Sequence, residues 1–505
     1  MKWATAALCV TLLAPLALVD VPPLLDYPNH LARAVVLAFG GTDPILSRMY
    51  AAHWAIIPNL GTDLVLPPLL HALPVHLAGR LVIGCITLLP VVGTIAYSRA
   101  TFGTRSAWPL ASGLVAYNAT LLLGFLNFVA AIGGALLLAA VWIAYRDRAP
   151  FRTMPLSIIG IAALFFCHLM GVVFCFALIT GHELEWIWIR RTDGAAVLGR
   201  IASLVPLAVV PAGLYLLSPL APMAADIVFP SLGEKARQLI FPFVNYLMPL
   251  DIITACAVGA FILACFVTGR YRITSASAVA LLLVAALYLV TPSDFKGTFH
   301  FDLRFVIMLA FLLFGGVLPA GLSRAATYGV WTGFVLLFIA RMSVVAFAWH
   351  EYRHDVAELR SVIAQVPPGA RVYLAAVSPQ EAPDYWRNGP LARRLSNGMR
   401  TDVHLPALLL IERRAYWPFL FDNPSQQPVE TVSPYRALAA REAALTDHGA
   451  LAELGRIDLC GYDDLLLIDA GGEPDLPHLG AGRLTLLERT DFAALFRIDR
   501  PNCPS

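Results

Sequence analysis

Charged residues are scarce in this sequence. Only 14% of its 505 residues are Asp, Glu, Lys or Arg, against about a quarter in an average soluble protein. Hydrophobic residues make up 58%, and the mean hydropathy is +0.70. This composition excludes a cytosolic enzyme, a disordered chain and a nucleic-acid-binding protein, and the net charge of +2 gives no reason to expect a polyanionic partner. The sequence therefore predicts a membrane protein.

Common catalytic and metal-binding motifs are missing as well. The chain contains no CxxC pair and no Cys/His metal spacing, and its C-terminal third has no Gly-rich phosphate loop, G-x-S-x-G or HExxH. Six of the eight cysteines lie in apolar segments, as small buried hydrophobic residues do. Cys460 and Cys503 stand apart near the C-terminus. An oxidising compartment would allow them to form a disulfide, and two free thiols are the alternative.

The charges that are present divide the chain in two. Residues 1–349 hold 20 Lys/Arg and 13 Asp/Glu, whereas residues 350–505 hold 16 and 21. We interpret the first part as a transmembrane domain and the second, the C-terminal domain, as a soluble α/β domain. The C-terminal domain is expected to contain one helix and four strands, over 355–365, 371–377, 465–468, 484–487 and 494–498.

About eleven spanning helices are expected, because a span needs roughly 20 mainly apolar residues. They cover Trp3–Val19, Leu81–Tyr97, Trp108–Leu123, Phe128–Tyr145, Pro155–Cys167, Leu169–Ile189, Ile201–Leu217, Ile252–Val267, Ser275–Val290, Phe305–Leu322 and Tyr328–Trp349. The first is expected to be a retained helix, with a cleaved signal peptide as the alternative. The short fifth and sixth are expected to form a hairpin turning at His168, because one long helix would separate two Arg-rich loops.

Positively charged residues collect in alternate loops of the first part. These are short loops, in which Lys and Arg mark the cytoplasmic side. We therefore expect a multi-pass protein of the cell inner membrane with its N-terminus in the cytoplasm. The loop over residues 20–80, called the first loop below, and the C-terminal domain then lie outside. The lipid bilayer is one expected partner, and nothing indicates nucleic acid.

The first loop carries the most informative segment, Asp26-Tyr27-Pro28-Asn29-His30. Pro28 suits the first turn of a helix, and Asp26, His30 and Arg33 would then lie on one face. Because the loop is far longer than a plain connection, we expect helices lying in the membrane interface. The alternative is that Asp26 only caps this helix, with His30 and Arg33 facing solvent.

Other polar residues are predicted at the same side of the membrane. They are Asp63 in the first loop, Asn127 in a Gly124–Phe128 turn, His168 in the hairpin, and Lys296 and Arg304 before the tenth span. Each is weak evidence alone. Because the predicted topology brings them together with the first loop, we expect a shared site.

This arrangement resembles the GT-C superfamily of membrane glycosyltransferases. The resemblance rests on the long first loop with Asp26 near its start, the short hairpin Cys167-His168-Leu169-Met170-Gly171, the external C-terminal domain and Arg304 at the start of a late helix. Many members have an acidic pair in this loop, whereas this chain has Asp26-Tyr27 with His30 a turn later. The sequence also resembles uncharacterised bacterial membrane proteins with similar "DYPNH" and "GFLNF" segments.

The resemblance implies transfer of a sugar from a polyprenyl-phosphate-linked donor to an acceptor hydroxyl in the cell envelope. Asp26 would be the general base. Arg304 and Arg33 would bind the lipid phosphate, supported by Lys296 and His168. Residues also expected to bind substrate are His30, Asn127 and Asp63, the last as the only candidate for a second carboxylate.

Two questions stay open at this point. A divalent cation, Mg or Mn, held by Asp26 and His30 is one option, although two ligands do not make a site. The alternatives to an enzyme are a non-catalytic assembly or sensor protein with a partner-binding C-terminal domain, and a transporter or flippase.

Overall fold

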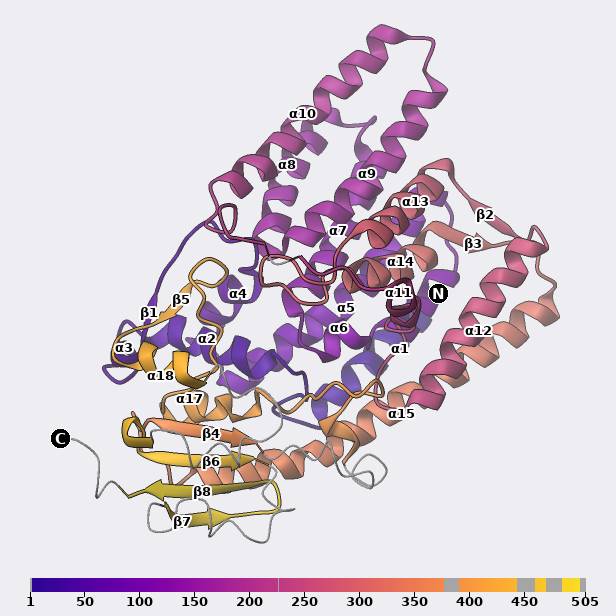
Figure 1. Ribbon diagram of the computed structural model, residues 1–505. Helices are drawn as coiled ribbons and strands as arrows, with labels where there is room; N and C mark the ends of the chain where they lie inside the picture. Colours follow the sequence, from indigo (N-terminus) through magenta and orange to yellow (C-terminus); the bar gives the residue numbers. More distant parts are fainter. Residues whose placement is uncertain (1, 226, 377–389, 443–458, 469–483, 500–505) are drawn as a thin grey trace.

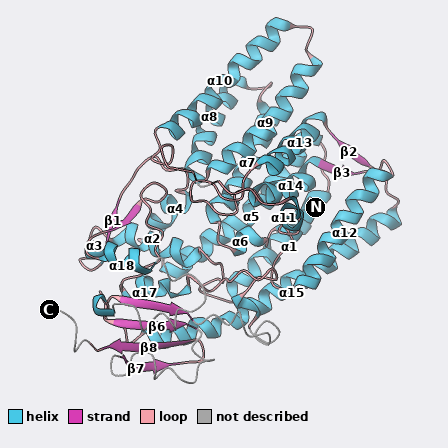
Figure 2. Ribbon diagram, in the orientation of Figure 1, coloured by secondary structure: helices cyan, strands magenta, loops and turns pink. Residues whose placement is uncertain are grey.

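The computed structural model describes residues 2–225, 227–376, 390–442, 459–468 and 484–499, and the described chain is mostly helical (Figures 1 and 2). Among these residues, seven helices are long and apolar enough to cross a membrane. They are α5 (Val75–Phe102), α7 (Leu126–Tyr145), α8 (Pro150–Cys167), α9 (Leu169–Ile189), α10 (Gly194–Leu216), α12 (Met248–Val267) and α15 (Arg324–Ile363). The protein is therefore a helical protein of membrane character, as its composition predicts.

Three shorter apolar helices complete the set within the described part of the chain. They are α1 (Lys2–Leu13), which continues as the 3-10 helix η1 (Ala14–Ala17), α13 (Ser275–Val290) and α14 (Leu303–Gly316). Ten of the eleven predicted segments thus contain an apolar helix. The hairpin prediction is also confirmed. His168, in extended conformation, is the single residue between α8 and α9. Arg200 pairs with both Asp147, just before α8, and Glu183, late in α9, so the far ends of the two helices lie together.

The prediction of a regular helix over Trp108–Leu123 is wrong. This segment forms the 3-10 helix η2 (Trp108–Val115) and the short helix α6 (Ala119–Leu122). Asn118 ends the first and caps the second, accepting hydrogen bonds from the backbone of Thr120 and Leu121. Nearly the whole segment is buried. Irregular backbone is tolerated at membrane depth only where protein surrounds it, and hydropathy does not distinguish that case from a helix facing lipid.

The predicted helix over Phe305–Leu322 ends early. Helix α14 stops at Gly316, and β3 (Val317–Pro319) follows, paired antiparallel with β2 (Tyr271–Ile273). Two consecutive glycines at the end of α14 weaken the helix at this point.

Helix α15 joins the two parts of the protein. Its 40 residues correspond to about 60 Å, roughly twice the hydrocarbon thickness of a bilayer. The predicted span over 328–349 and the predicted helix over 355–365 are therefore one continuous helix, which ends at Ile363. The expected domain boundary at residue 350 lies inside this helix, so a rigid element carries the C-terminal domain (Figure 1).

The predicted strands of the C-terminal domain are confirmed. They form one sheet in the order β4-β6-β8-β7, with β4 and β6 parallel and the other pairs antiparallel. The strands are β4 (Val372–Ala376), β6 (Asp464–Ile468), β7 (Leu484–Arg489) and β8 (Ala493–Ile498). Shorter elements of this domain are η4 (Leu391–Arg393), η5 (Leu405–Ala407), α17 (Leu408–Arg413), β5 (Val429–Thr431), α18 (Tyr435–Glu442) and η6 (Leu459–Gly461).

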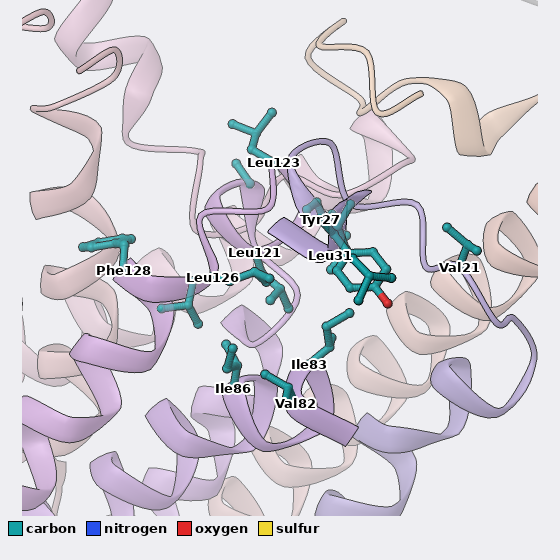
Figure 3. Packing of buried hydrophobic residues seen from close by; sticks show 14 of the residues in the cluster. Val21, Tyr27, Leu31, Val82, Ile83, Ile86, Leu121, Leu123, Leu126 and Phe128 are labelled. Atoms are coloured by element: carbon teal, nitrogen blue, oxygen red, sulfur yellow. The ribbon is translucent and has the colours of Figure 1, made fainter. Parts of the chain in front are cut away.

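The first loop folds against both parts. It contains α2 (Tyr27–Phe39), α3 (Leu46–Met49), β1 (Tyr50–Ala52) and α4 (Gly61–Leu70). Strand β1 pairs antiparallel with β5 of the C-terminal domain. We expected a helix lying in the membrane interface, but α2 is buried from Tyr27 to Val36. In Figure 3, Tyr27 and Leu31 of α2 face Val82 and Ile83 of α5.

The remaining short helix, α11 (Leu232–Gln238), lies in the loop between α10 and α12.

Candidate functional site

One cavity of about 350 Å³ collects residues from distant parts of the chain. Seven of the eight residues singled out in the sequence line it: Asp26, His30, Arg33, Asn127, His168, Lys296 and Arg304. They come from the start of α2, the starts of α7 and α14, the α8–α9 hairpin and the loop before α14. The eighth, Asp63, is not among the lining residues.

The position of Asp26 is fixed by contacts of its backbone with the Leu123–Gly124 turn. It occupies the N-cap position of α2, but its side chain makes no capping hydrogen bond. Its backbone N–H donates to the Leu123 carbonyl at 3.2 Å. The next residue of that turn, Gly124, has φ +79°, and a Cβ there would lie 2.6 Å from the Asp26 nitrogen. The two segments singled out in the sequence, around Asp26 and Gly124, are thus in direct contact, and Asp26 lines the cavity.

His30 lies one turn further along α2 and is 6% exposed. Its Nδ1 is 3.2 Å from Nη2 of Arg33 and 3.1 Å from Oγ1 of Thr62. A guanidinium can only donate hydrogen bonds, so Nδ1 of His30 accepts and carries no proton. Burial, and then the charge of Arg33, hold the pKa of His30 well below its usual value. His30 is therefore a neutral imidazole in the wall of the cavity.

Arg33 and Asp63 form a buried ion pair. Nε of Arg33 donates to Oδ1 of Asp63 at 2.6 Å, and Nη2 donates to Oδ2 at 2.8 Å. The pair ties α2 to α4, and its Arg33 lines the cavity. Both oxygens of Asp63 are engaged and the charge of Arg33 is compensated.

Asn127 holds the first loop against the start of α7. Its Oδ1 accepts from the Thr62 backbone at 2.7 Å, and its Nδ2 donates to both oxygens of Asn59 at 2.9 Å. His168 is similarly engaged, because its Nδ1 accepts from the Met170 backbone at 3.1 Å. Both residues line the cavity, but the polar atoms named here are engaged in hydrogen bonds within the protein.

Arg304 is a buried cation. Its Nη1 donates to the carbonyls of Phe299 and His300, at 3.2 and 3.4 Å, and its guanidinium lies 5.0 Å from the centre of the Phe125 ring. No carboxylate of the described residues lies within ion-pair distance of it, and its Nε has no hydrogen-bond partner. The carboxylate of the neighbouring Asp302 is paired instead with Lys235, whose Nζ donates to Oδ2 at 3.3 Å.

Lys296 is a second cation without a carboxylate partner among the residues that the structure covers. Its Nζ donates to the carbonyls of Leu220 and Ala221, at 3.0 and 2.7 Å, and to the Tyr215 hydroxyl at 3.1 Å. Its backbone is left-handed, with φ +50°, a conformation that costs a non-glycine residue energy and often marks functional loops. Among the described lining residues, Asp26 is the one carboxylate beside these two cations.

These residues do not fit a divalent cation. No group of three His, Cys, Asp or Glu side chains in the described ranges is arranged to hold a metal ion. Of the two expected ligands, His30 has its Nδ1 engaged by Arg33 and Thr62. The positive charges of Lys296 and Arg304 line the same cavity and would repel a cation.

The C-terminal domain covers the cavity with residues that the sequence did not single out. Phe421, Gln426 and Gln427 line it, and Nδ1 of His404 lies 3.1 Å from Oδ1 of Asp26. The Phe421 ring packs edge-on against His404, with ring centres 5.2 Å apart. These residues are nearly 400 positions from Asp26 and belong to no motif, so no sequence signal marked them.

The disulfide expectation concerns two cysteines. Cys460 is disulfide-bonded, and the six cysteines of the apolar segments are free. Cys503 lies outside the described residues.

Comparison with known proteins gives no family assignment. No family model matches the sequence, and no curated protein matches it.

Proposed function

We propose that the protein is a GT-C-like membrane glycosyltransferase with about eleven membrane crossings. It moves a sugar from a polyprenyl-phosphate-linked donor to an acceptor hydroxyl at the outer face of the cell inner membrane. One observation carries the proposal: Asp26, with no capping hydrogen bond, shares a cavity with Arg304 and Lys296, two cations that lack a carboxylate partner in the described chain.

The two cations suit the phosphate of the donor. Arg304 is buried and Lys296 is half-buried, and a cation with little water around it attracts an anion strongly because its charge is little screened. The Arg304 guanidinium can donate to phosphate oxygens in a fork, and Lys296 adds a point charge. Arg33 is less suited to this role than the resemblance implies, because Asp63 compensates its charge. Arg304 and Lys296 would stabilise the lipid phosphate as it leaves.

Asp26 is the base of the proposed reaction. The acceptor oxygen attacks the anomeric carbon and forms the new C–O bond, while the bond from that carbon to the phosphate oxygen breaks. The phosphate keeps the electron pair, and the acceptor proton moves to the Asp26 carboxylate. A retaining mechanism needs a second carboxylate about 5 Å away, and both oxygens of Asp63 are held by Arg33. We therefore propose direct attack with inversion.

The orientation in the membrane is part of the proposal. The Arg-rich short loops of the first part would lie in the cytoplasm, and the cavity and the C-terminal domain outside. Exposed apolar side chains at the cavity support contact with the bilayer: Leu216 and Leu217, which follow the lining residue Tyr215, and Phe299, which lines the cavity, are each at least 70% exposed. The lipid chain of the donor would reach the cavity from there.

Transfer by the purified protein in lipid vesicles tests the proposal, with a labelled polyprenyl-phosphate sugar as donor. We expect Asp26→Asn to lower transfer at least ~10²-fold, the usual contribution of a general base, and to leave donor binding intact. Arg304→Ala should instead weaken donor binding. Asp491→Asn, at an exposed position of the β7–β8 turn, is the matched control and should be fully active.

Three outcomes separate the proposed function from its alternatives. Full activity of Asp26→Asn would remove Asp26 from the chemistry. Flux of substrate into vesicles without transfer would favour a transporter or flippase. Neither transfer nor flux, with a partner bound by the C-terminal domain, would favour an assembly or sensor protein.

A further inference from the structure

The C-terminal domain reaches Asp26 through one side chain, His404. Nδ1 of His404 lies 3.1 Å from Oδ1 of Asp26, and each side chain is 17% exposed. The two atoms are within hydrogen-bond distance, but they are not aligned for a hydrogen bond. Nδ1 has no other hydrogen-bond partner in the described chain. Catalytic hydrogen bonds are often poorly aligned before substrate binds and tighten in the complex. His404 and Asp26 are therefore as close as a catalytic base and the group that orients it. Only the angle of the hydrogen bond between them is missing.

Packing, and not Asp26, sets the position of the His404 ring. The His404 carbonyl accepts from the Ala407 backbone at 3.0 Å, which fixes the start of η5. Leu405 and Ala407 of η5 are fully buried. The Phe421 ring stands perpendicular to the imidazole, with an interplanar angle of 90°. His404 is thus held in place by its own domain.

The same domain is joined to the helix that begins after Asp26. Nε1 of Trp417 donates to Oδ1 of Asn29 at 2.6 Å, and Nδ2 of Asn29 donates to the Phe419 carbonyl at 3.0 Å. Asn29 lies three residues after Asp26. The pairing of β1 with β5 adds a second connection between the first loop and this domain. The docking of the C-terminal domain on α2 therefore determines the distance between His404 and Asp26.

We propose that His404 is a positioning residue for Asp26, so that proton transfer requires the C-terminal domain to be docked on α2. The inference rests on the proposed function. The imidazole N–H of His404 donates to Oδ1 of Asp26, which turns Oδ2 toward the acceptor hydroxyl. His404 itself gains and loses no proton in the step. A base oriented by a third group is a recurring arrangement in catalysis.

The test uses the full chain in lipid vesicles. We expect His404→Ala to lower kcat about 10–100-fold, by analogy with the loss of a partner that orients a metal-binding side chain, while KM for the donor stays within twofold. His404→Gln, whose amide can still donate, should lose less. Added imidazole should restore part of the activity of His404→Ala. His350→Ala, at an exposed histidine of α15, is the control and should leave kcat unchanged.

The outcomes distinguish this inference from the proposed function. A wild-type protein that transfers no sugar would overturn both together. An active wild type whose His404→Ala variant keeps its kcat would overturn the inference alone. So would equal losses in the Ala and Gln variants without rescue by imidazole, because they would mean that His404 only fills space.

Discussion

Arg33 and Asp63, thirty residues apart in the first loop, are joined by two hydrogen bonds of 2.6 and 2.8 Å, with side chains only 1% and 0% exposed. This pair decides how many carboxylates the candidate site has. A carboxylate whose two oxygens both accept from one guanidinium is not available to act on a substrate. The pair thus leaves Asp26 as the one carboxylate lining the described cavity.

We expect Asp63→Asn to act on stability. The substitution leaves the Arg33 guanidinium buried without a counter-charge, which costs about 3–5 kcal/mol. The double variant Arg33→Met/Asp63→Leu removes both charges and should recover much of that loss. Thermal denaturation in detergent measures both. A normal melting temperature for Asp63→Asn, combined with a loss of transfer, would instead give Asp63 a catalytic role.

We expect Gly124→Ala to displace Asp26. Gly124 has φ +79°, and its new Cβ would lie 2.6 Å from the Asp26 nitrogen and 2.9 Å from the Asp26 Cβ. The left-handed conformation alone costs an alanine about 1 kcal/mol, and the overlap adds to this. Transfer should fall further than stability explains, because the base moves.

Gly103→Ala is the matched control for that variant. Gly103 also has a left-handed backbone, with φ +65°, but nothing lies within 4 Å of a Cβ built there. It should show the backbone cost in a thermal melt and keep full transfer activity. Equal activities of the Gly124 and Gly103 variants would contradict the importance of the contact with Asp26.

The long apolar helices were predictable because the length of an apolar run can be read directly from the sequence. The prediction failed at Trp108–Leu123, since a segment enclosed by protein is as apolar as a segment facing lipid. The strands of the C-terminal domain were predictable from short apolar runs. That α15 continues through residue 350 was not, because its polar second half resembles a separate helix.

The site was predictable as a set of residues but not as a set of contacts. The topology predicted from the sequence puts Asp26, Asn127, His168 and Arg304 on one side, and the structure brings them to one cavity. Pairing depends on distances that one sequence does not contain. Neither the ion pair that engages Asp63 nor the approach of His404 to Asp26 leaves a local pattern.

The protonation of His30 provides a last prediction, on the pH dependence of stability. Its Nδ1 accepts a hydrogen bond from Arg33, and burial holds its pKa in the folded protein well below the usual value. In the unfolded chain that pKa returns to about 6.5. As the pH falls below about 6.5, the unfolded chain binds a proton that the folded protein does not. The stability present at neutral pH is therefore lost as the medium becomes acidic, by up to about 1.4 kcal/mol per pH unit.

The variant His30→Gln isolates this contribution, because a glutamine oxygen can accept from Arg33 and Thr62 but does not titrate. Burial also lowers the pKa of His300, so the wild type loses stability from more than one group, and the difference between the two proteins is the informative quantity. When the pH is lowered from 7.5 to 5.5, the melting temperature should fall less in His30→Gln than in the wild type. The exposed His350→Gln variant should follow the wild type. Parallel behaviour of wild type and His30→Gln would mean that His30 accepts its proton in the folded protein, which the hydrogen bond from Arg33 does not allow.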